Sequence, residues 1–387
     1  MTPLRLVVLG TVASDPYAGM AWMHMQIAAG LQRLGHDVYY FETTSSWPYD
    51  PVRETRVGDS DYALPYLKRV AENFGLGDRW GYRRSYGDKA WFGISRVSAE
   101  EWLAEADAVF NVTGSTPLAE EGLKTGRLVY LGTDPVAHEI GFAKGDRDAT
   151  RIIEEHHDFV TYGENIGTPT CRIPPLPGLR ARMRQPVLLD LWESGPPSKE
   201  AFTTVCNWKQ DGELEFEGEK YYWSKDREFL KFIDLPKRIS QPLELAMGAA
   251  SLTPEVSTML TSYGWRLTDA HSITTSPWPY RDYVRASRGE FTVAKDQNVR
   301  LRSGWFSERS ACYLAAGRPV ITQDTGFGKV LPTGQGLFAF NTMDDILSAF
   351  DAVRSDYERH SRAAREIAHE YFRAETVLAR LLRDLGL

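Results

Sequence analysis

The chain has 387 residues, which is long for a single hydrophobic core and suits two domains. Charged residues make up 25% and hydrophobic residues 42%, as expected of a soluble globular protein, and the net charge of −7 argues against nucleic acid or an anionic membrane as the main partner. No apolar stretch approaches the length of a bilayer span, and the scattered Cys171, Cys206 and Cys312 favour a reducing cytoplasm over a disulfide framework or a zinc site.

The first half of the chain predicts a doubly wound sheet. Residues 4–10 form an apolar run too short for a signal-peptide core, so we interpret them as a buried strand. Residues 19–34 have helical spacing, Gly35 ends this helix, and residues 37–42 form the next strand. This is a βαβ unit with a parallel sheet. Further strands are expected at 108–113, 128–132 and 159–162.

Two segments interrupt this pattern. Residues 43–98 are rich in Tyr, Trp, Arg and Gly with weak periodicity, and we interpret them as an insertion of helices and long loops near a binding cleft. The proline-rich runs 173–178 and 195–197 can neither form a helix nor lie centrally in a sheet, so they indicate an interdomain connection. We expect a Rossmann-like domain over residues 1–180 and a linker over residues 181–200.

The second half repeats the architecture. The expected strands are 203–206, 243–247, 265–269, 290–294 and one beginning at Pro319; the expected helices are 226–232, 254–263, 280–286 and 357–385. These elements predict a second Rossmann-like domain over residues 201–362, followed by C-terminal helices over 363–387 that can pack back on the first domain. The fold class is therefore α/β, with two doubly wound Rossmann-like domains facing across a cleft formed by the carboxyl ends of both sheets.

Residues 303–322 are the most informative stretch. They predict a glycine-containing loop, a short helix capped by Ser307 and a following strand. Free backbone N–H groups and the positive helix end attract anions, and Arg302, Arg309 and Ser310 lie beside them in the sequence. The stretch therefore suits a diphosphate. The alternative is an ordinary αβ unit whose arginines face water.

Four segments resemble, in the same order along the chain, the GT-B glycosyltransferases, which use nucleotide-activated sugars. They are Gly-Leu-Gln-Arg-Leu-Gly-His-Asp-Val at 30–38, Tyr-Arg-Asp-Tyr-Val-Arg-Ala-Ser at 280–287, the helix–strand at 307–321 with its Ala-Ala-Gly-Arg-Pro-Val-Ile close, and the tail at 363–372. The first is similar to that superfamily's L-x-x-x-G-H-x-V segment, and the last two to "group 1" glycosyltransferase domains. The resemblance implies a GT-B fold and a glycosyltransferase of the hexosyltransferase type.

One departure from the family bears on stereochemistry. Retaining enzymes of this superfamily usually carry two glutamates eight positions apart before the Gly-x-Pro-Val segment. Here Gly304 and Cys312 occupy those positions, and Glu308 is out of register. The departure favours an inverting enzyme, which needs a base to deprotonate the acceptor and a means to neutralise the departing diphosphate.

The candidate bases lie in the first domain. Asp15 follows the first strand, and in similar enzymes an Asp or His in this loop is the base; the alternative is that Asp15 caps a turn. His24, early in the next helix, is the rival base, or a histidine hydrogen-bonded to a neighbour. Glu42 and Asp134 are strand-end carboxylates that could orient the base or the acceptor, although Asp134 also suits a plain turn.

The candidate donor site lies in the second domain. We find no Asp-x-Asp in the cleft-forming loops, so we expect neutralisation of the diphosphate without a metal. The family often places basic phosphate contacts after the first strand of this domain, which points to Lys209. Lys295 follows another strand; a lone lysine at a strand end is otherwise solvated. Together with Arg302, Ser307, Arg309 and Ser310 these lysines would form a diphosphate cradle.

The remaining donor contacts come from two loops. In similar enzymes the loop holding His271 and Ser272 lies against the nucleobase. Asp324, Thr325 and Gly326 follow the next strand and would lie beside the sugar ring, or they form a tight glycine turn. No cofactor is expected besides the nucleotide sugar, with a UDP- or dTDP-sugar as donor.

These features predict a cytoplasmic, inverting, metal-independent glycosyltransferase that moves a sugar from an NDP-sugar to a small-molecule or lipid-like acceptor. The aromatic segment before residue 102 favours a specialised natural product or a glycolipid as acceptor. No nucleic acid or integral membrane partner is expected. Two alternatives stay open: a sugar-nucleotide epimerase of the same fold, and a non-catalytic nucleotide-sugar-binding protein.

Overall fold

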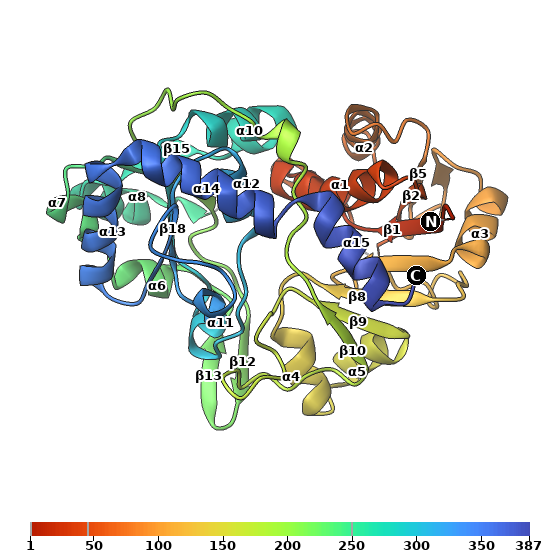
Figure 1. Ribbon diagram of the computed structural model, residues 1–387. Helices are drawn as coiled ribbons and strands as arrows, with labels where there is room; N and C mark the ends of the chain where they lie inside the picture. The colour runs from red at the N-terminus through yellow and green to blue at the C-terminus, as the bar shows by residue number, and fades with distance from the viewer. Residues whose placement is uncertain (1, 45, 249–250) are drawn as a thin grey trace.

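The computed structural model describes residues 2–44, 46–248 and 251–387. These residues form two halves, each built on a largely or wholly parallel sheet with helices packed around it (Figure 1). The expected α/β class with two doubly wound, Rossmann-like domains is confirmed.

The first sheet has the strand order β10-β9-β8-β7-β1-β2-β5-β6. Its strands are β1 (Arg5–Leu9), β2 (Asp37–Glu42), β5 (Trp80–Arg83), β6 (Trp91–Phe92), β7 (Ala108–Val112), β8 (Leu128–Gly132), β9 (Asp158–Thr161) and β10 (Leu179–Arg182). Its helices are α1 (Ala18–Arg33), α2 (Ala63–Asn73), α3 (Arg96–Glu105), α4 (Ala137–Ala143) and α5 (Arg147–Glu154). Because every pair except β5–β6 is parallel, the carboxyl ends of the central strands lie at one edge.

The second sheet has the order β15-β14-β11-β16-β17-β18, and all its pairs are parallel. Its strands are β11 (Phe202–Cys206), β14 (Leu243–Met247), β15 (Arg266–Asp269), β16 (Gly289–Thr292), β17 (Val320–Gln323) and β18 (Leu337–Phe340). The helices are α6 (Asp226–Leu230), α7 (Leu235–Arg238), α8 (Pro254–Ser262), α9 (His271–Thr274), α10 (Pro277–Ala286), α11 (Asp296–Arg300), α12 (Glu308–Ala315), α13 (Met343–Ser355), α14 (Tyr357–Tyr371) and α15 (Ala374–Asp384).

The segment 43–98 contains more sheet than the sequence predicted. It holds a small hairpin, β3 (Tyr49–Asp50) and β4 (Thr55–Arg56), and it adds β5 and β6 to the main sheet beyond β2. The expectation of helices and loops alone was wrong because these strands have four residues or fewer. Such short strands show too few alternating positions for a period of two to stand out.

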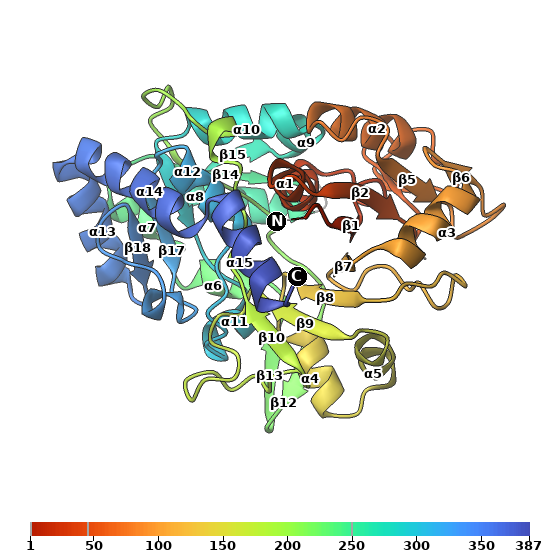
Figure 2. The ribbon, with the colours of Figure 1, turned by 45° about the vertical axis from the view of Figure 1, so that its right-hand side comes forward.

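The two domains are connected twice. β10 extends to Arg182, beyond the expected boundary at residue 180, and residues 183–201 then cross to the second sheet. The chain returns through α14, which runs across the expected boundary between 362 and 363, and through α15, which lies beside α1 in Figures 1 and 2. The Arg127 guanidinium donates to the carbonyl of Leu385 at 2.6 Å, which fixes the end of α15 on the first domain.

One hydrophobic core spans both domains, and α1 lies in its middle. The Trp22 ring of α1 contacts the ring of Trp192 in the linker, with centroids 4.5 Å apart, and that of Trp278 in α10 at 5.5 Å. The Trp22 indole N–H donates to the carbonyl of Pro277 at 2.9 Å. The apolar face of α1 therefore serves as a packing surface between domains as well as within the first one.

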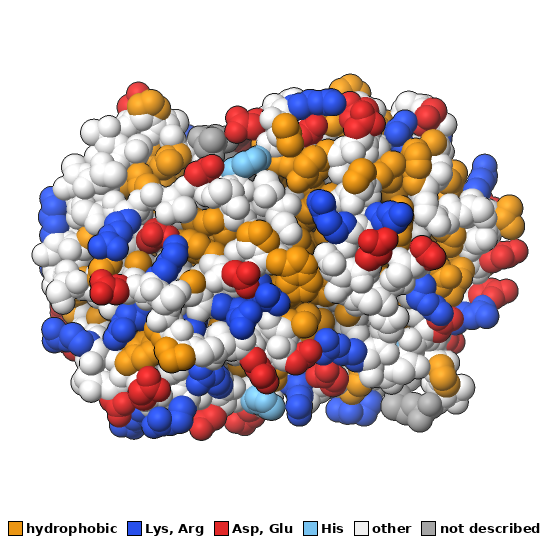
Figure 3. Space-filling view, turned by 90° about the horizontal axis from the view of Figure 1, so that it is seen from above, with side chains coloured by type: hydrophobic (Ala, Val, Ile, Leu, Met, Phe, Trp, Pro, Cys, Tyr) orange, Lys and Arg blue, Asp and Glu red, His pale blue; other side chains and the backbone are white. Residues whose placement is uncertain are grey.

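The surface is charged and mixed. On the face drawn in Figure 3, positive and negative side chains are interspersed around smaller apolar areas. Among the helices that the described residues form, none combines the length and the apolarity needed to cross a membrane.

Candidate active site

The carboxyl ends of the two sheets meet directly. After β8, Asp134 forms an ion pair with Lys295, which follows β16, and the carbonyl of Thr133 accepts a hydrogen bond from the Trp305 indole at 2.9 Å. After β9, the backbone N–H of Asn165 donates to the carbonyl of Ser303 at 3.1 Å. The loops that follow these strands thus face one another across the domain boundary, as the switch-point rule anticipates for a ligand site.

Asn165 makes the closest of these contacts. Its side-chain amide donates to the carbonyls of Arg302 and Gly326, at 3.2 and 3.1 Å. Gly304 and Gly326 permit this approach, because a Cβ atom on either would lie within 3 Å of Asn165. Gly326, expected beside a sugar ring, therefore also forms part of the domain contact.

Three cations converge at the carboxyl ends of β11 and β16. They are Lys225, Lys295 and Arg309. Lys295 is 9% exposed, and its ammonium lies 4.1 Å from the centroid of the Trp223 ring. Burial lowers the pKa of Lys295, and the Asp134 carboxylate opposes that shift.

Arg309 is held deep in this cluster. Its guanidinium pairs with the buried carboxylate of Glu290 and donates to the carbonyl of Val205 at 2.7 Å and to the hydroxyl of Thr292 at 3.1 Å. All three contacts lie within the second domain. Arg309 therefore adds positive charge to the site from behind the strand ends, with most of its donors already engaged.

Lys225 is the functional candidate that the sequence analysis missed. It is 7% exposed, and burial, then the positive charge of Arg309, lowers its pKa to about 7, with Lys295 adding to the shift. Lys209, which we expected in this place, is exposed. The sequence analysis missed Lys225 because a hairpin separates it from β11 in the chain. This hairpin consists of β12 (Glu213–Phe216) and β13 (Glu219–Tyr222), and Lys225 follows it.

The facing edge of the first domain is organised by Glu42. This buried carboxylate accepts hydrogen bonds from the backbone N–H groups of Ala13 and Ser14, at 2.8 and 2.6 Å, and from the Tyr40 hydroxyl at 3.0 Å. Burial raises the pKa of Glu42 to about 7, and these hydrogen bonds limit the rise. Glu42 thereby fixes the loop that carries Asp15.

Asp15 lies at the surface of that loop. Its carboxylate is 30% exposed and accepts a hydrogen bond at 2.8 Å from Arg56, on the β3–β4 hairpin. Among the described residues Arg56 is the one donor to this carboxylate, so its orientation is fixed while its second oxygen accepts no hydrogen bond from them.

His24 lies in a different environment. It has no exposed surface, its Nδ1 lies 2.8 Å from the carbonyl of Met20, and its Nε2 has no partner among the described residues. The ring packs so closely on Gly10 that a Cβ there would lie 2.1 Å from it. Burial lowers the pKa of His24 to about 4. A substrate has no access to this side chain in the arrangement described.

The start of α12 faces the first domain. Ser307 is the N-cap residue without a side-chain capping bond, and the hydroxyl of Ser310 is buried without a partner in the described part of the chain. Between them, Glu308 accepts a hydrogen bond from the Gln26 amide of α1 at 2.7 Å and another from the Cys312 thiol at 3.2 Å. Burial raises the pKa of Glu308 to about 7.

The predicted sugar and nucleobase residues lie in two loops. Arg302 donates to the carboxylate of Asp324 at 2.8 Å, and the Thr325 hydroxyl donates to the carbonyl of Trp305 at 2.6 Å. Both contacts join the loop after β17 to the segment before α12. His271 and Ser272 begin α9 after β15. Ser272 is exposed and its hydroxyl donates to the carbonyl of Asp269 at 3.0 Å.

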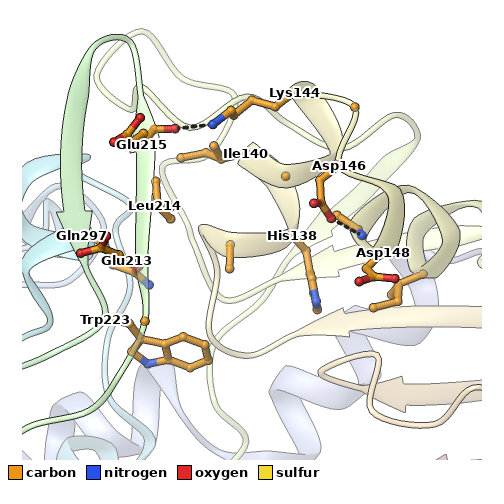
Figure 4. A pocket seen from close by; sticks show the side chains of 16 residues that line it. His138, Ile140, Lys144, Asp146, Asp148, Glu213, Leu214, Glu215, Trp223 and Gln297 are labelled. Atoms are coloured by element: carbon orange, nitrogen blue, oxygen red, sulfur yellow. Dashed lines mark hydrogen bonds between the residues drawn. The ribbon is translucent and has the colours of Figure 1, made fainter.

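A cavity of about 740 Å³ adjoins the cation cluster. One wall comes from α4 and α5 of the first domain and the other from the β12–β13 hairpin, Trp223 and Gln297 of the second (Figure 4). Trp223 belongs to both places, because its ring lines the cavity and also contacts the Lys295 ammonium. Over residues 2–44, 46–248 and 251–387, no three His, Cys, Asp or Glu side chains gather as a group that could hold a metal ion. Asp146 and Asp148, which line the cavity, are however an Asp-x-Asp pair that the sequence analysis did not place in a cleft-forming loop.

Comparison with solved structures identifies the architecture. HepE of Anabaena, solved in complex with UDP-glucose, superposes over 99% of both chains with a TM-score of 0.60 and 11% sequence identity. The pneumococcal O-GlcNAc transferase GtfA, solved with UDP and GlcNAc, superposes over 100% of this chain and 99% of that one, with a TM-score of 0.55 and 9% identity. The chain has a GT-B fold. The predicted fold is thus confirmed over the full length. No family model and no curated protein matches the sequence.

Proposed function

We propose that this GT-B protein is a glycosyltransferase that transfers a sugar from a nucleoside diphosphate sugar to an acceptor. The observation that carries the proposal is the cluster of Lys225, Lys295 and Arg309 at the domain boundary. Glu290 pairs with Arg309 and Asp134 with Lys295, whereas for Lys225 the described residues supply neither a salt bridge nor a hydrogen bond from its side chain. Burial lowers the pKa of this side chain to about 7, and a bound anion such as a diphosphate would stabilise its charged form.

The cluster supplies the electrostatic part of such a reaction. As the bond between the sugar and the diphosphate breaks, negative charge develops on the leaving phosphate oxygens. Lys225 and Lys295 would contact these oxygens, and Arg309 would act through its charge. The partnerless hydroxyl of Ser310 and the first N–H groups of α12 are further donors near the same edge. This charge distribution supports catalysis without a metal ion.

Asp15 is our candidate for the base. It would take the proton of the acceptor hydroxyl while that oxygen attacks the anomeric carbon, which inverts the configuration there. Arg56 orients the carboxylate, and Glu42 positions the loop through the N–H groups of Ala13 and Ser14. We prefer Asp15 over His24 because His24 has no exposed surface.

The donor is proposed to be a UDP-sugar, since HepE and GtfA, with the same fold, were solved with UDP and a sugar or UDP-glucose. His271 and Ser272 would lie by the base, and Asp324 and Thr325 by the sugar, as the resemblance implies. The three cysteines are free thiols, which supports a reducing compartment.

Isothermal titration with UDP, dTDP and GDP tests the proposal. We expect at least one to bind with a dissociation constant at or below about 1 mM, which corresponds to roughly 4 kcal/mol. Binding of none would overturn the proposal.

Incubation with the bound donor and an acceptor panel, followed by mass spectrometry, then detects transfer. A changed sugar nucleotide without added acceptor would instead indicate an epimerase. The anomeric configuration of the product, read by NMR, tests inversion, and activity in EDTA tests metal independence.

A further inference from the structure

The cavity beside the cation cluster has a composition that selects its ligand. Four carboxylates line it, from Asp146, Asp148, Glu213 and Glu215, and the lining ammonium is that of Lys144. Glu213 pairs with Lys220 at 2.8 Å and Asp146 caps α5, so Asp148 and Glu215 are the carboxylates that neither of these contacts occupies. The Lys144 ammonium is already hydrogen-bonded within the protein, because its Nζ donates to the carbonyl of Glu215 at 2.9 Å (Figure 4). The field inside the cavity is therefore negative, in contrast to the positive cluster next to it.

The cavity also has apolar and hydrogen-bonding surface. The Trp223 ring forms one end, the side chains of Ile140 and Leu214 contribute apolar walls, and Gln297 offers an amide (Figure 4). The indole N–H of Trp223 is buried without a partner among the described residues. An aromatic face together with several acceptors and few donors suits a ligand that presents C–H surface and many hydroxyl groups.

The position of the cavity connects it to the proposed reaction. Its end at Trp223 touches Lys295, so a ligand lying there would approach the leaving diphosphate. Its walls come from different domains, and the wall from the second domain is the hairpin inserted after β11. A volume of about 740 Å³ is large enough for an oligosaccharide of a few units.

Building on the proposed function, we propose that this cavity is the acceptor site and that it takes a saccharide without negative charge, either neutral or bearing an amine. Hydroxyl and ammonium groups would donate to Asp148 and Glu215, and a sugar ring would lie on Trp223. The carboxylates would repel a phosphorylated or uronic-acid acceptor. The cavity thus separates two ligands by charge: the anionic donor on the cation cluster and a non-anionic acceptor beside it.

The test measures saccharide binding to the full-length protein loaded with UDP. A panel of disaccharides of different linkage is titrated in three matched forms, neutral, amino and uronic-acid, with nucleotide binding measured in parallel on every sample. We expect at least one linkage to bind in the neutral or amino form and its uronic-acid form to bind at least about tenfold more weakly. Two variants then locate the site. Asp148→Trp places a bulky ring into the cavity from an exposed position on α5, and Asp148→Lys with Glu215→Lys reverses its charge.

Glu154→Trp is the matched control, because Glu154 is exposed on the same helix and does not line the cavity. Asp148→Trp should abolish saccharide binding while the control retains it, and the double lysine variant should favour the uronic-acid form. Equal binding of all three forms, retained binding in Asp148→Trp, or no saccharide binding by a protein that binds UDP would each overturn the inference while leaving the proposed function standing. Failure to bind any nucleotide would instead remove the proposed function.

Discussion

The two sheet edges that meet at the domain boundary use buried charge in opposite ways. At the first edge the single carboxylate of Glu42 accepts hydrogen bonds from Ala13, Ser14 and Tyr40, so its hydrogen-bonding capacity is consumed by the protein. At the second edge Lys225 has no such partner among the described residues. Charge that the protein satisfies internally fixes a loop, whereas charge left over attracts a ligand.

Replacing the candidate base should give the largest effect. Asp15→Asn keeps the shape of the side chain and its bond from Arg56 but removes the proton acceptor. We expect the transfer rate to fall by about 10²- to 10⁴-fold, with UDP binding unchanged. Single-turnover transfer and calorimetry measure the two quantities. An Asp15→Asn variant with the wild-type rate would show that another group takes the proton.

Removing the surplus cation should come next. Lys225→Met retains the apolar stem and deletes the ammonium, so UDP binding should weaken by about 1.5–3 kcal/mol, or roughly 10- to 150-fold. Thermal stability should be kept or increased, because an unpaired buried charge is removed. Lys209→Ala is the matched control: this lysine is exposed, and we expect less than about threefold change. The reverse ranking of the two variants would place the diphosphate elsewhere.

The pH dependence of stability tests the first edge. The pKa of Glu42 lies at about 7 in the folded protein and at its ordinary value of 4.5 when unfolded. The folded state therefore holds this proton more tightly, so its stabilising contribution is complete below pH 4.5 and is lost as the pH rises through about 7. Relative to Glu42→Gln, the wild type should lose on the order of 3 kcal/mol between these values. Denaturant unfolding at a series of pH values measures the difference; a constant difference would contradict the predicted shift.

Removing the carboxylate that pairs with Lys295 should have the smallest effect. Asp134→Asn leaves Lys295 without its carboxylate, so the surplus positive charge grows. We expect UDP to bind roughly two- to fivefold more tightly at low salt, with the gain reduced as salt is added. Weaker binding in this variant would mean that Asp134 positions Lys295 for the phosphate and does not compete with it.

The regular elements were predictable because their signals are local. The strands at 37–42, 128–132 and 243–247 were predicted with the boundaries that the structure has. The strand at 128–132 is buried throughout, and the other two are mostly buried in a parallel sheet, with half-buried residues at Asp37, Tyr39 and Glu244. The C-terminal end of α12 was likewise predictable from Gly317, which adopts a φ of 69°.

The candidate site was less predictable because its partners are distant in sequence. Nothing near Arg309 in the chain indicates that Glu290 and Val205 occupy its guanidinium. Lys225 was missed because the β12–β13 hairpin separates it from β11 in the sequence. In space the base of the hairpin brings it close to Lys209, since the N–H of Gln210 donates to the Ser224 hydroxyl at 3.2 Å. The strands of segment 43–98 were missed for a different reason. They are short, β5 and β6 lie at the edge of the main sheet, and β3 and β4 form a separate two-stranded sheet.

The contact of Asn165 with the second domain depends on two glycines, Gly304 and Gly326. The N–H and amide of Asn165 reach three carbonyls of the opposite domain only because positions 304 and 326 are glycines, both at positive φ. An alanine methyl at 304 would lie 2.7 Å from the backbone nitrogen of Asn165, which cannot rotate away as a side chain can. Such a methyl group would push the lobes apart, so small-angle scattering of Gly304→Ala should report a larger radius of gyration.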